Sequence, residues 1–167
     1  SALARWFHRA GYLVAGYDRS PSSITLKLQS EGINMTFIDA VTEIPASFKQ
    51  NIANVLVVYT PAVPSTSQVM QFFQKNSYTV IKRSQALGLL VKDKSGIAVA
   101  GTHGKTSISA TIAWLMKESA SAFLGGISKN LDSNVLINHK ADNVVVEADE
   151  FDRSFLALYP EIAVVTA

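Results

Sequence analysis

The sequence predicts an α/β protein with two successive parallel-sheet domains. Short apolar, β-branched runs alternate along the chain with segments of helical periodicity, which is the pattern of β-α-β units. A polar, turn-like stretch at 92–96 interrupts this alternation, and a glycine-containing loop at 101–107 joins a strand to a helix where it resumes. We therefore expect a first domain over residues 1–93 and the beginning of a second over 94–167.

Each element of the first domain follows from its local pattern. The opening helix has Leu3, Trp6, Phe7 and Ala10 on one apolar face. Residues 22–31 alternate as a strand would, but Gly32 as a C-cap favours a helix. The expected order is the opening helix, strand 12–18, helix 22–31, strand 35–38, strand 55–59, helix around 69–73, strand 79–81 and helix 85–91. The apolar run at 55–59 is typical of a parallel strand covered on both faces.

In the second domain we expect a strand at 97–100, a helix that follows the loop as far as about Ser119, and strands near Ala122, at 143–147 and at 162–166. The chain opens in a helical pattern and closes on a buried-strand pattern. We therefore expect the sequence to continue at both ends in its natural protein.

Composition narrows the class of protein. Hydrophobic residues make up 48% of the 167 residues and charged residues 17%, so a folded core is expected. The net charge of +2 gives no reason to expect a nucleic-acid or membrane partner. The chain has no cysteine, which excludes disulfides and thiolate chemistry. No apolar run approaches the roughly 20 residues that cross a bilayer, and no signal peptide is visible, so a cytoplasmic location is expected.

The loop that follows the strand at 97–100 has the composition of a phosphate-binding loop. It reads Gly101, Thr102, His103, Gly104, Lys105, Thr106, Ser107. The two glycines allow a tight turn whose amides, at the start of a helix, attract an anion. The lysine would contact the β- and γ-phosphates of a nucleotide, and the Thr106 hydroxyl would bind Mg²⁺.

The match to a standard phosphate loop is incomplete. The pattern G-x-x-x-x-G-K-[ST] requires glycine where Val99 stands. The loop is therefore a shortened variant, and the alternative is a glycine-rich turn with a solvated lysine. The β-branched strand before the loop and the amphipathic helix after it favour phosphate binding.

Four carboxylates lie at and beyond the end of the strand at 143–147. They are Glu147, Asp149, Glu150 and Asp152. Ligands of α/β proteins gather at the carboxyl ends of strands, and a carboxylate there can hold Mg²⁺. Glu147, the first after the apolar run, is the expected metal ligand. The alternative is a solvated acidic turn whose members cap a helix.

Several segments together resemble the Mur ligases. The loop at 100–106 is similar to the ATP loop of that family, and its histidine resembles the branch that joins L-alanine to UDP-N-acetylmuramate. The segments 59–64, 82–85, 122–130 and 146–156 are similar to the same branch. The resemblance extends over nearly the whole chain.

The resemblance implies a Rossmann-like domain for the UDP-sugar, then the start of a phosphate-loop ATPase domain, with the family's first strand, its glycine-rich UDP loop and its third domain outside this sequence. It implies an ATP-dependent ligase of peptidoglycan precursor synthesis that uses ATP and Mg²⁺ and acts through an acyl phosphate. The fragment alone would be inactive.

The resemblance also implies roles for particular residues. Lys105 and Glu147 would be catalytic, Thr106 and Glu147 would hold the metal, and residues 101–107 would bind ATP. Asp18, Thr60, Pro61 and His103 would contact the UDP-sugar substrate, although His103 could instead pack within the loop. The oligomeric state, monomer or dimer, is left open.

Other functions are compatible with some of the same residues. Within the family, a murein-peptide ligase would add a recycled tripeptide to the same UDP-sugar. Folate polyglutamate ligases share the ATP loop but do not account for the first half of the chain. Residues 1–92 could form a nicotinamide-dinucleotide module, in which the loop at 101–107 has no role. A regulatory ATP-binding switch is the remaining alternative.

Overall fold

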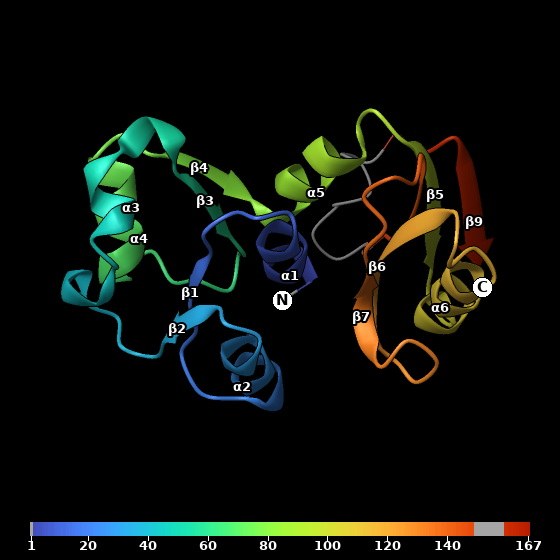
Figure 1. Ribbon diagram of the computed structural model, residues 1–167, viewed down its shortest axis with the longest axis horizontal. Coiled ribbons are helices and arrows are strands. Elements are labelled where there is room, and N and C mark those ends of the chain that lie inside the picture. The colour runs from blue at the N-terminus through green and yellow to red at the C-terminus, as the bar shows by residue number, and fades with distance from the viewer. Residues whose placement is uncertain (1, 149–158) are drawn as a thin grey trace. The chain divides into compact units, whose positions relative to one another are not determined.

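The computed structural model describes residues 2–148 and 159–167, and these residues form two compact units. The first unit holds Phe7–Ala86; the second holds Ala2–Trp6 and the described residues from Leu87 to Ala167. The helices and strands run in this order (Figure 1): α1 (Ala2–Arg9), β1 (Ala15–Tyr17), α2 (Ser23–Ser30), β2 (Asn34–Thr36), η1 (Val41–Glu43), α3 (Ser47–Gln50), η2 (Ile52–Asn54), β3 (Leu56–Tyr59), α4 (Gln68–Lys75), β4 (Thr79–Lys82), α5 (Arg83–Val91), β5 (Ser95–Gly101), α6 (Lys105–Leu115), β6 (Ala120–Ser128), β7 (Ser133–Leu136), β8 (Asn143–Glu147) and β9 (Ile162–Thr166).

The first unit contains two small parallel sheets, β1 with β2 and β3 with β4. The predicted helix at 22–31 is confirmed as α2. It begins with a capping box between Ser22 and Thr25, which satisfies backbone donors at the helix start. It ends just before Gly32, whose φ of +91° is the left-handed conformation expected after a helix.

The start of α4 is held by a carboxylate from a distant part of the first unit. Asp39 accepts hydrogen bonds from the Ser67 hydroxyl (2.9 Å), the Gln68 N–H (3.1 Å) and the Val69 N–H (3.0 Å). The Val69 bond is the largest cause that lowers the pKa of Asp39 below its ordinary value of 3.8; partial burial acts in the opposite direction. The carboxylate thus supplies orphan helix amides with an acceptor.

One expectation for the first unit is wrong. The run at 55–59 was expected to be covered on both faces, but Leu56 is 42% and Val58 37% exposed. Exposure alternates along β3, as it does in a strand with one covered face. Among the described residues β3 pairs with β4 alone, so the apolar run reflects strand propensity and not full burial.

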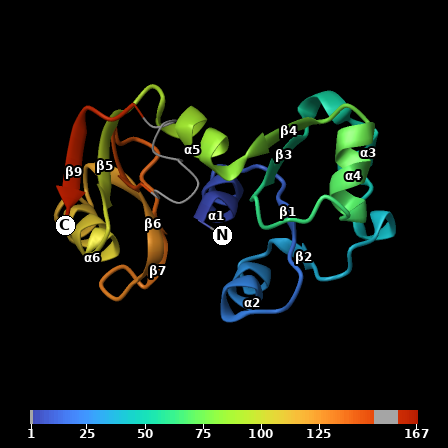
Figure 2. The same cartoon turned by 180° about the vertical axis from the view of Figure 1, so that it is seen from behind.

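The second unit is built on a five-stranded sheet of order β7-β6-β8-β5-β9. All neighbouring strands are parallel except β6 and β7, which form an antiparallel pair. Figure 2 shows α6 alongside β5 and β9 from behind. The strands predicted at 97–100, near 122, at 143–147 and at 162–166 are all present.

Alternate residues of each central strand pack on opposite faces of this sheet. Val144 and Val146 belong to one apolar cluster, with Phe123 and the helix residue Leu87, while Val145 belongs to another. The first cluster also receives α1 residues, and the second packs under α6. The three valines are at most 2% exposed; each contributes about 1.5–3 kcal/mol by its burial. The predicted buried strand before Glu147 is therefore confirmed.

Two details of the second unit differ from the expectation. Helix α6 ends at Leu115 and not near Ser119, because the Met116 carbonyl accepts the N–H groups of both Ser119 and Ala120 and closes a turn. Strand β7 was not expected. Its four residues lack a long apolar run, and the hairpin turn before it includes Asp132, whose φ is +43°.

Candidate functional site

The predicted loop connects β5 to α6 at the carboxyl edge of the five-stranded sheet. Gly104 precedes the first helical residue with a φ of +74°, and α6 starts without a side-chain cap. A glycine adopts this left-handed conformation without steric cost. The helix start therefore leaves backbone N–H groups and a partial positive charge directed into the loop, which favours an anion there.

Strand β9 also contacts the loop, through Thr166. Gly101 pairs with Thr166 across β5 and β9, and a Cβ at Gly101 would overlap the Thr166 carbonyl and hydroxyl oxygens. The Thr166 hydroxyl lies within hydrogen-bonding distance of the Ala100 carbonyl (3.2 Å) and also contacts the His103 carbonyl. One side chain thus ties the entry of the loop to its exit.

Lys105 folds back over the loop that precedes it. Its ammonium donates to the Gly101 carbonyl and lies 3.5 Å from the Thr102 carbonyl oxygen. In this position the Lys105 ammonium would contact an anion bound by the loop. The ammonium is a compact point charge on a flexible stem, so it can exchange these carbonyl contacts for phosphate oxygens.

Glu147, at the end of β8, reaches the first turn of α6. Its Oε1 accepts a hydrogen bond of 2.8 Å from the Thr106 hydroxyl, and its Oε2 accepts one of 2.8 Å from the Gly125 N–H. The hydroxyl of Ser109, which is fully buried, lies 3.4 Å from Oε2. A Cβ on Gly125 would lie 2.5 Å from Oε1, so β6 approaches the carboxylate this closely only because residue 125 is glycine.

A hollow of about 300 Å³ opens between the loop and this carboxylate. It is lined by Thr102, Gly104, Lys105, Thr106, Ser107 and Glu147. The structure therefore brings the predicted lysine, hydroxyl and carboxylate to one place, although Thr106 at the start of α6 and Glu147 in β8 are 41 residues apart.

The donor set suits magnesium. A hydroxyl and a carboxylate oxygen lie 2.8 Å apart, and Mg²⁺ prefers such oxygen ligands, completing its shell with water and substrate phosphates. Within residues 2–148 and 159–167 no group of three or more His, Cys, Asp or Glu side chains is gathered as a metal site. Asp149, Glu150 and Asp152, which were named with Glu147, lie outside the described residues.

The histidine of the loop points to solvent. His103 is exposed, and in the described part of the chain its side chain has no hydrogen-bond partner, since the Thr166 contact is to its carbonyl. The exposed position leaves the imidazole available to a ligand and does not match a histidine that packs within the loop.

The substrate residues expected in the first unit lie at the carboxyl ends of its strands. Asp18 follows β1, is exposed, and its N–H donates to the Thr36 carbonyl at 3.1 Å. Thr60 and Pro61 follow β3 and are also exposed. The Thr60 carbonyl accepts the Val63 N–H at 3.0 Å and closes a turn.

Three contributors to the site were not predicted. Ser109 lies next to the loop because of its position on the helix, and Thr166 because of the pairing register of its strand. A single sequence does not specify this packing or this register. Gly125 could have been found from the sequence, because a glycine inside a strand often marks a close approach of another group.

Comparison with known proteins assigns the family. Residues 1–95 match the Mur ligase family, catalytic domain. This is more than half of the sequence, and the chain therefore belongs to the Mur ligase family. The phosphate-loop residues follow the matched region, but they fall within the alignments to curated relatives, which cover 99–100% of the chain.

Two of these relatives are UDP-N-acetylmuramate–L-alanine ligases. That of Cytophaga hutchinsonii is 48% identical over 171 residues, covering 99% of this chain and 36% of the relative. That of Porphyromonas gingivalis is 48% identical over 170 residues, covering 100% and 37%. The chain thus spans a little over a third of the length of the curated relatives it matches.

Solved structures have the same fold. A UDP-N-acetylmuramate–alanine ligase from Thermotoga maritima matches with a TM-score of 0.82 and 26% identity over 98% of this chain and 37% of that one. The UDP-N-acetylmuramate:L-alanyl-γ-D-glutamyl-meso-diaminopimelate ligase of Neisseria meningitidis gives 0.85 and 22% over 98% and 55%. The predicted α/β class with parallel sheets is confirmed.

Proposed function

We propose that this chain is part of an ATP-dependent ligase that joins L-alanine to the carboxylate of UDP-N-acetylmuramate in peptidoglycan precursor synthesis. The observation that carries the proposal is the meeting of Lys105, Thr106 and Glu147 around one hollow at the sheet edge. The 48% identity to two ligases of this name supports the choice of substrates.

The loop residues would hold the nucleotide. We assign residues 101–107 to the triphosphate, with the α6 amides and Lys105 as donors. Thr106 and Glu147 would bind Mg²⁺, which on binding neutralises phosphate charge and orients the γ-phosphate. The Thr106–Glu147 hydrogen bond of 2.8 Å supports this pairing, because one cation can be coordinated by two oxygens held so close together.

The reaction requires two anions to approach each other. A carboxylate oxygen of the acceptor attacks the γ-phosphorus, the bond to the β-phosphate oxygen breaks, and ADP leaves with an acyl phosphate formed. The amine of L-alanine then attacks the acyl carbon, phosphate departs, and the amine loses a proton. The contribution of the protein is positioning and charge neutralisation, for which Lys105 is suitably placed.

The two parts of the chain would divide the work. We assign residues 1–93 to the UDP-sugar, with Asp18, Thr60 and Pro61 at the carboxyl ends of their strands as contacts, and residues 94–167 to ATP. His103 would contact a phosphate or the acceptor carboxylate.

No described helix is long and apolar enough to cross a membrane. We infer a cytoplasmic enzyme without nucleic-acid or membrane partners, acting as a monomer or dimer.

The proposal is tested with the full-length protein. Phosphate release should require ATP, UDP-N-acetylmuramate and L-alanine together. Omission of either UDP-N-acetylmuramate or L-alanine should abolish it. Replacing L-alanine with the tripeptide L-alanyl-γ-D-glutamyl-meso-diaminopimelate tests the murein-peptide alternative, which would release phosphate only with the peptide. ATP hydrolysis that proceeds equally well with water alone would instead indicate a nucleotide switch.

A further inference from the structure

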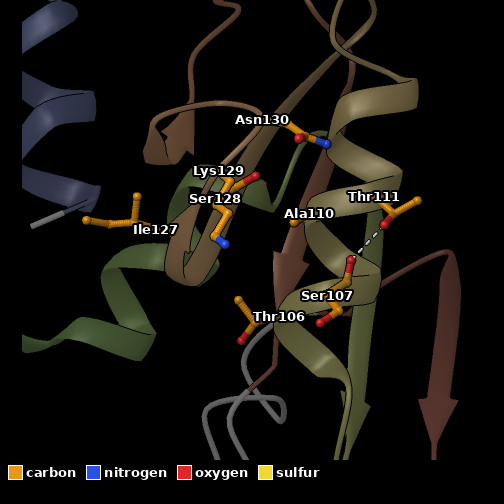
Figure 3. A pocket seen from close by; sticks show the side chains of 8 residues that line it. All are labelled: Thr106, Ser107, Ala110, Thr111, Ile127, Ser128, Lys129 and Asn130. Atoms are coloured by element: carbon orange, nitrogen blue, oxygen red, sulfur yellow. Dashed lines mark hydrogen bonds between the residues drawn. The ribbon is translucent and has the colours of Figure 1, made fainter.

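A second hollow, of about 250 Å³, lies beside the phosphate-loop hollow. One wall is α6, through Ser107 and Thr111, and the other is the end of β6 with the turn after it, through Ile127, Lys129 and Asn130 (Figure 3). Thr106 and Ser107 line both hollows. The two spaces are therefore neighbours on the first turn of α6.

The described residues that line the second hollow carry a single charge, and it is positive. Of the described residues that line it, Lys129 alone is charged, and the others offer hydroxyl, amide or apolar groups. Within residues 2–148 and 159–167, neither Lys129 nor Asn130 has a side-chain hydrogen bond or ion pair. An ammonium and an amide that have no partner among the described residues, in a hollow whose described lining contains no carboxylate, are suited to an anionic ligand.

The neighbouring phosphate loop limits which anion would bind in the second hollow. If the triphosphate occupies the loop, Lys105 and the metal are engaged by its phosphates, and an incoming carboxylate needs a cation of its own. Thr106 borders both hollows and bonds Glu147, so a group in the second hollow lies next to the metal site. At about 250 Å³ the space is smaller than the pocket of a drug-sized ligand, and it suits one end of a larger molecule.

We propose, on the basis of the function proposed above, that the second hollow receives the carboxylate end of the UDP-sugar acceptor and that Lys129 binds this carboxylate. Asn130 adds an amide donor. Lys129 thereby lowers the repulsion between the acceptor and the triphosphate and orients the attacking oxygen.

Substitution of the lysine in the full-length protein tests the assignment. Lys129→Met removes the charge, Lys129→Arg keeps it, and Lys140→Met removes an exposed lysine from the loop before β8, at the opposite edge of the sheet. Titrations compare UDP-N-acetylmuramate, UDP-N-acetylglucosamine, which lacks the lactyl carboxylate, and adenylyl imidodiphosphate with Mg²⁺.

Lys129→Met should weaken UDP-N-acetylmuramate binding about 10- to 100-fold, the range for one hydrogen bond to a charged group. Binding of UDP-N-acetylglucosamine and of the nucleotide should not change, Lys129→Arg should retain most of the affinity, and Lys140→Met should behave as the unaltered protein. Equal weakening for both UDP-sugars, a loss confined to the nucleotide, or no loss at all would overturn the assignment.

Failure of the proposed function would look different. The unaltered protein would then release no phosphate in the presence of UDP-N-acetylmuramate and L-alanine, whatever stands at position 129. That result would overturn the proposed function and the assignment of Lys129 together. A ligase that remains acceptor-dependent but does not respond to Lys129→Met would overturn the assignment alone.

Discussion

Replacing Gly125 with alanine should displace the Glu147 carboxylate without unfolding the chain. A Cβ at position 125 would lie 2.5 Å from Oε1, 2.7 Å from Cδ and 2.8 Å from Oε2 of Glu147. Contacts this short cannot persist, and the carboxylate, at the end of a flexible side chain, moves more easily than the two strands. Its hydrogen bonds to Thr106 and to the Gly125 N–H would break.

The magnitude follows from those two bonds, each 2.8 Å long. A hydrogen bond to a charged group contributes about 1.5–3 kcal/mol, but the displaced carboxylate reaches water in the adjoining hollow. We expect a loss of about 1–2 kcal/mol in the free energy of unfolding. The loss of activity should be larger, about 100-fold or more, because a ligand of the proposed Mg²⁺, which would neutralise the charge of the transferred phosphate group, is misplaced.

The assay measures phosphate release at increasing Mg²⁺ concentration, together with urea denaturation of the same samples. Gly126→Ala is the matched control, since its Cβ would meet only Thr106 Cγ2, at an ordinary 3.5 Å. We expect that Gly125→Ala needs more Mg²⁺ and has a lower maximal rate, while Gly126→Ala is close to the unaltered protein. Equal activity of both variants at every Mg²⁺ concentration would refute the role of Glu147.

Three further predictions concern the support of the loop and the first unit. Thr166→Val should weaken nucleotide binding about 5- to 10-fold, as expected for one neutral hydrogen bond of about 1 kcal/mol, and Thr166→Ser should restore it; calorimetric titration measures both. Gly101→Ala should cost about 2–4 kcal/mol in urea denaturation, because it adds strain at positive φ and a clash with the backbone. Asp39→Ala should cost about 1 kcal/mol at pH 7. The lowered pKa of Asp39 means that its charge stabilises the fold above about pH 3.8 and that this contribution is lost as pH falls through the folded-state pKa; denaturation at pH 7 and pH 3 should show the cost shrink.

The core of the site could be predicted because it is local in sequence. A β-branched strand, two glycines, a lysine and a threonine at the start of a helix are consecutive residues, and the backbone physics of a helix start explains each of them. Glu147 could be predicted from the sequence for a related reason. It is the first polar residue after the apolar run of a buried strand, and parallel strands of one sheet end at the same edge.

The supporting residues depend on register and tertiary packing. Ser109 and Thr106 lie three residues apart on α6, but only the position of β8 makes Ser109 contact the carboxylate. Thr166 reaches the loop because β9 pairs with β5 in one particular register, Gly101 opposite Thr166. The apolar pattern of β9 is compatible with several registers, so the hydroxyl contact could not be derived from it.

The burial of a strand does not follow from its apolar residues alone. The run at 55–59 and the run at 144–146 are both apolar and rich in β-branched residues, yet β8 is buried on both faces and β3 exposes Leu56 and Val58. Composition reports the propensity to form a strand. Burial depends on how many neighbours and helices cover that strand, which is a property of the assembled sheet.

The affinity of the loop for a triphosphate shows directly whether residues 101–107 form a nucleotide site. Calorimetric titration of the full-length protein with adenylyl imidodiphosphate and Mg²⁺ should show binding that Lys105→Ala weakens about 10- to 100-fold, with Lys140→Ala unchanged as the charge control. A Lys105→Ala protein that binds the nucleotide as tightly as the unaltered one would show that the loop does not hold the triphosphate.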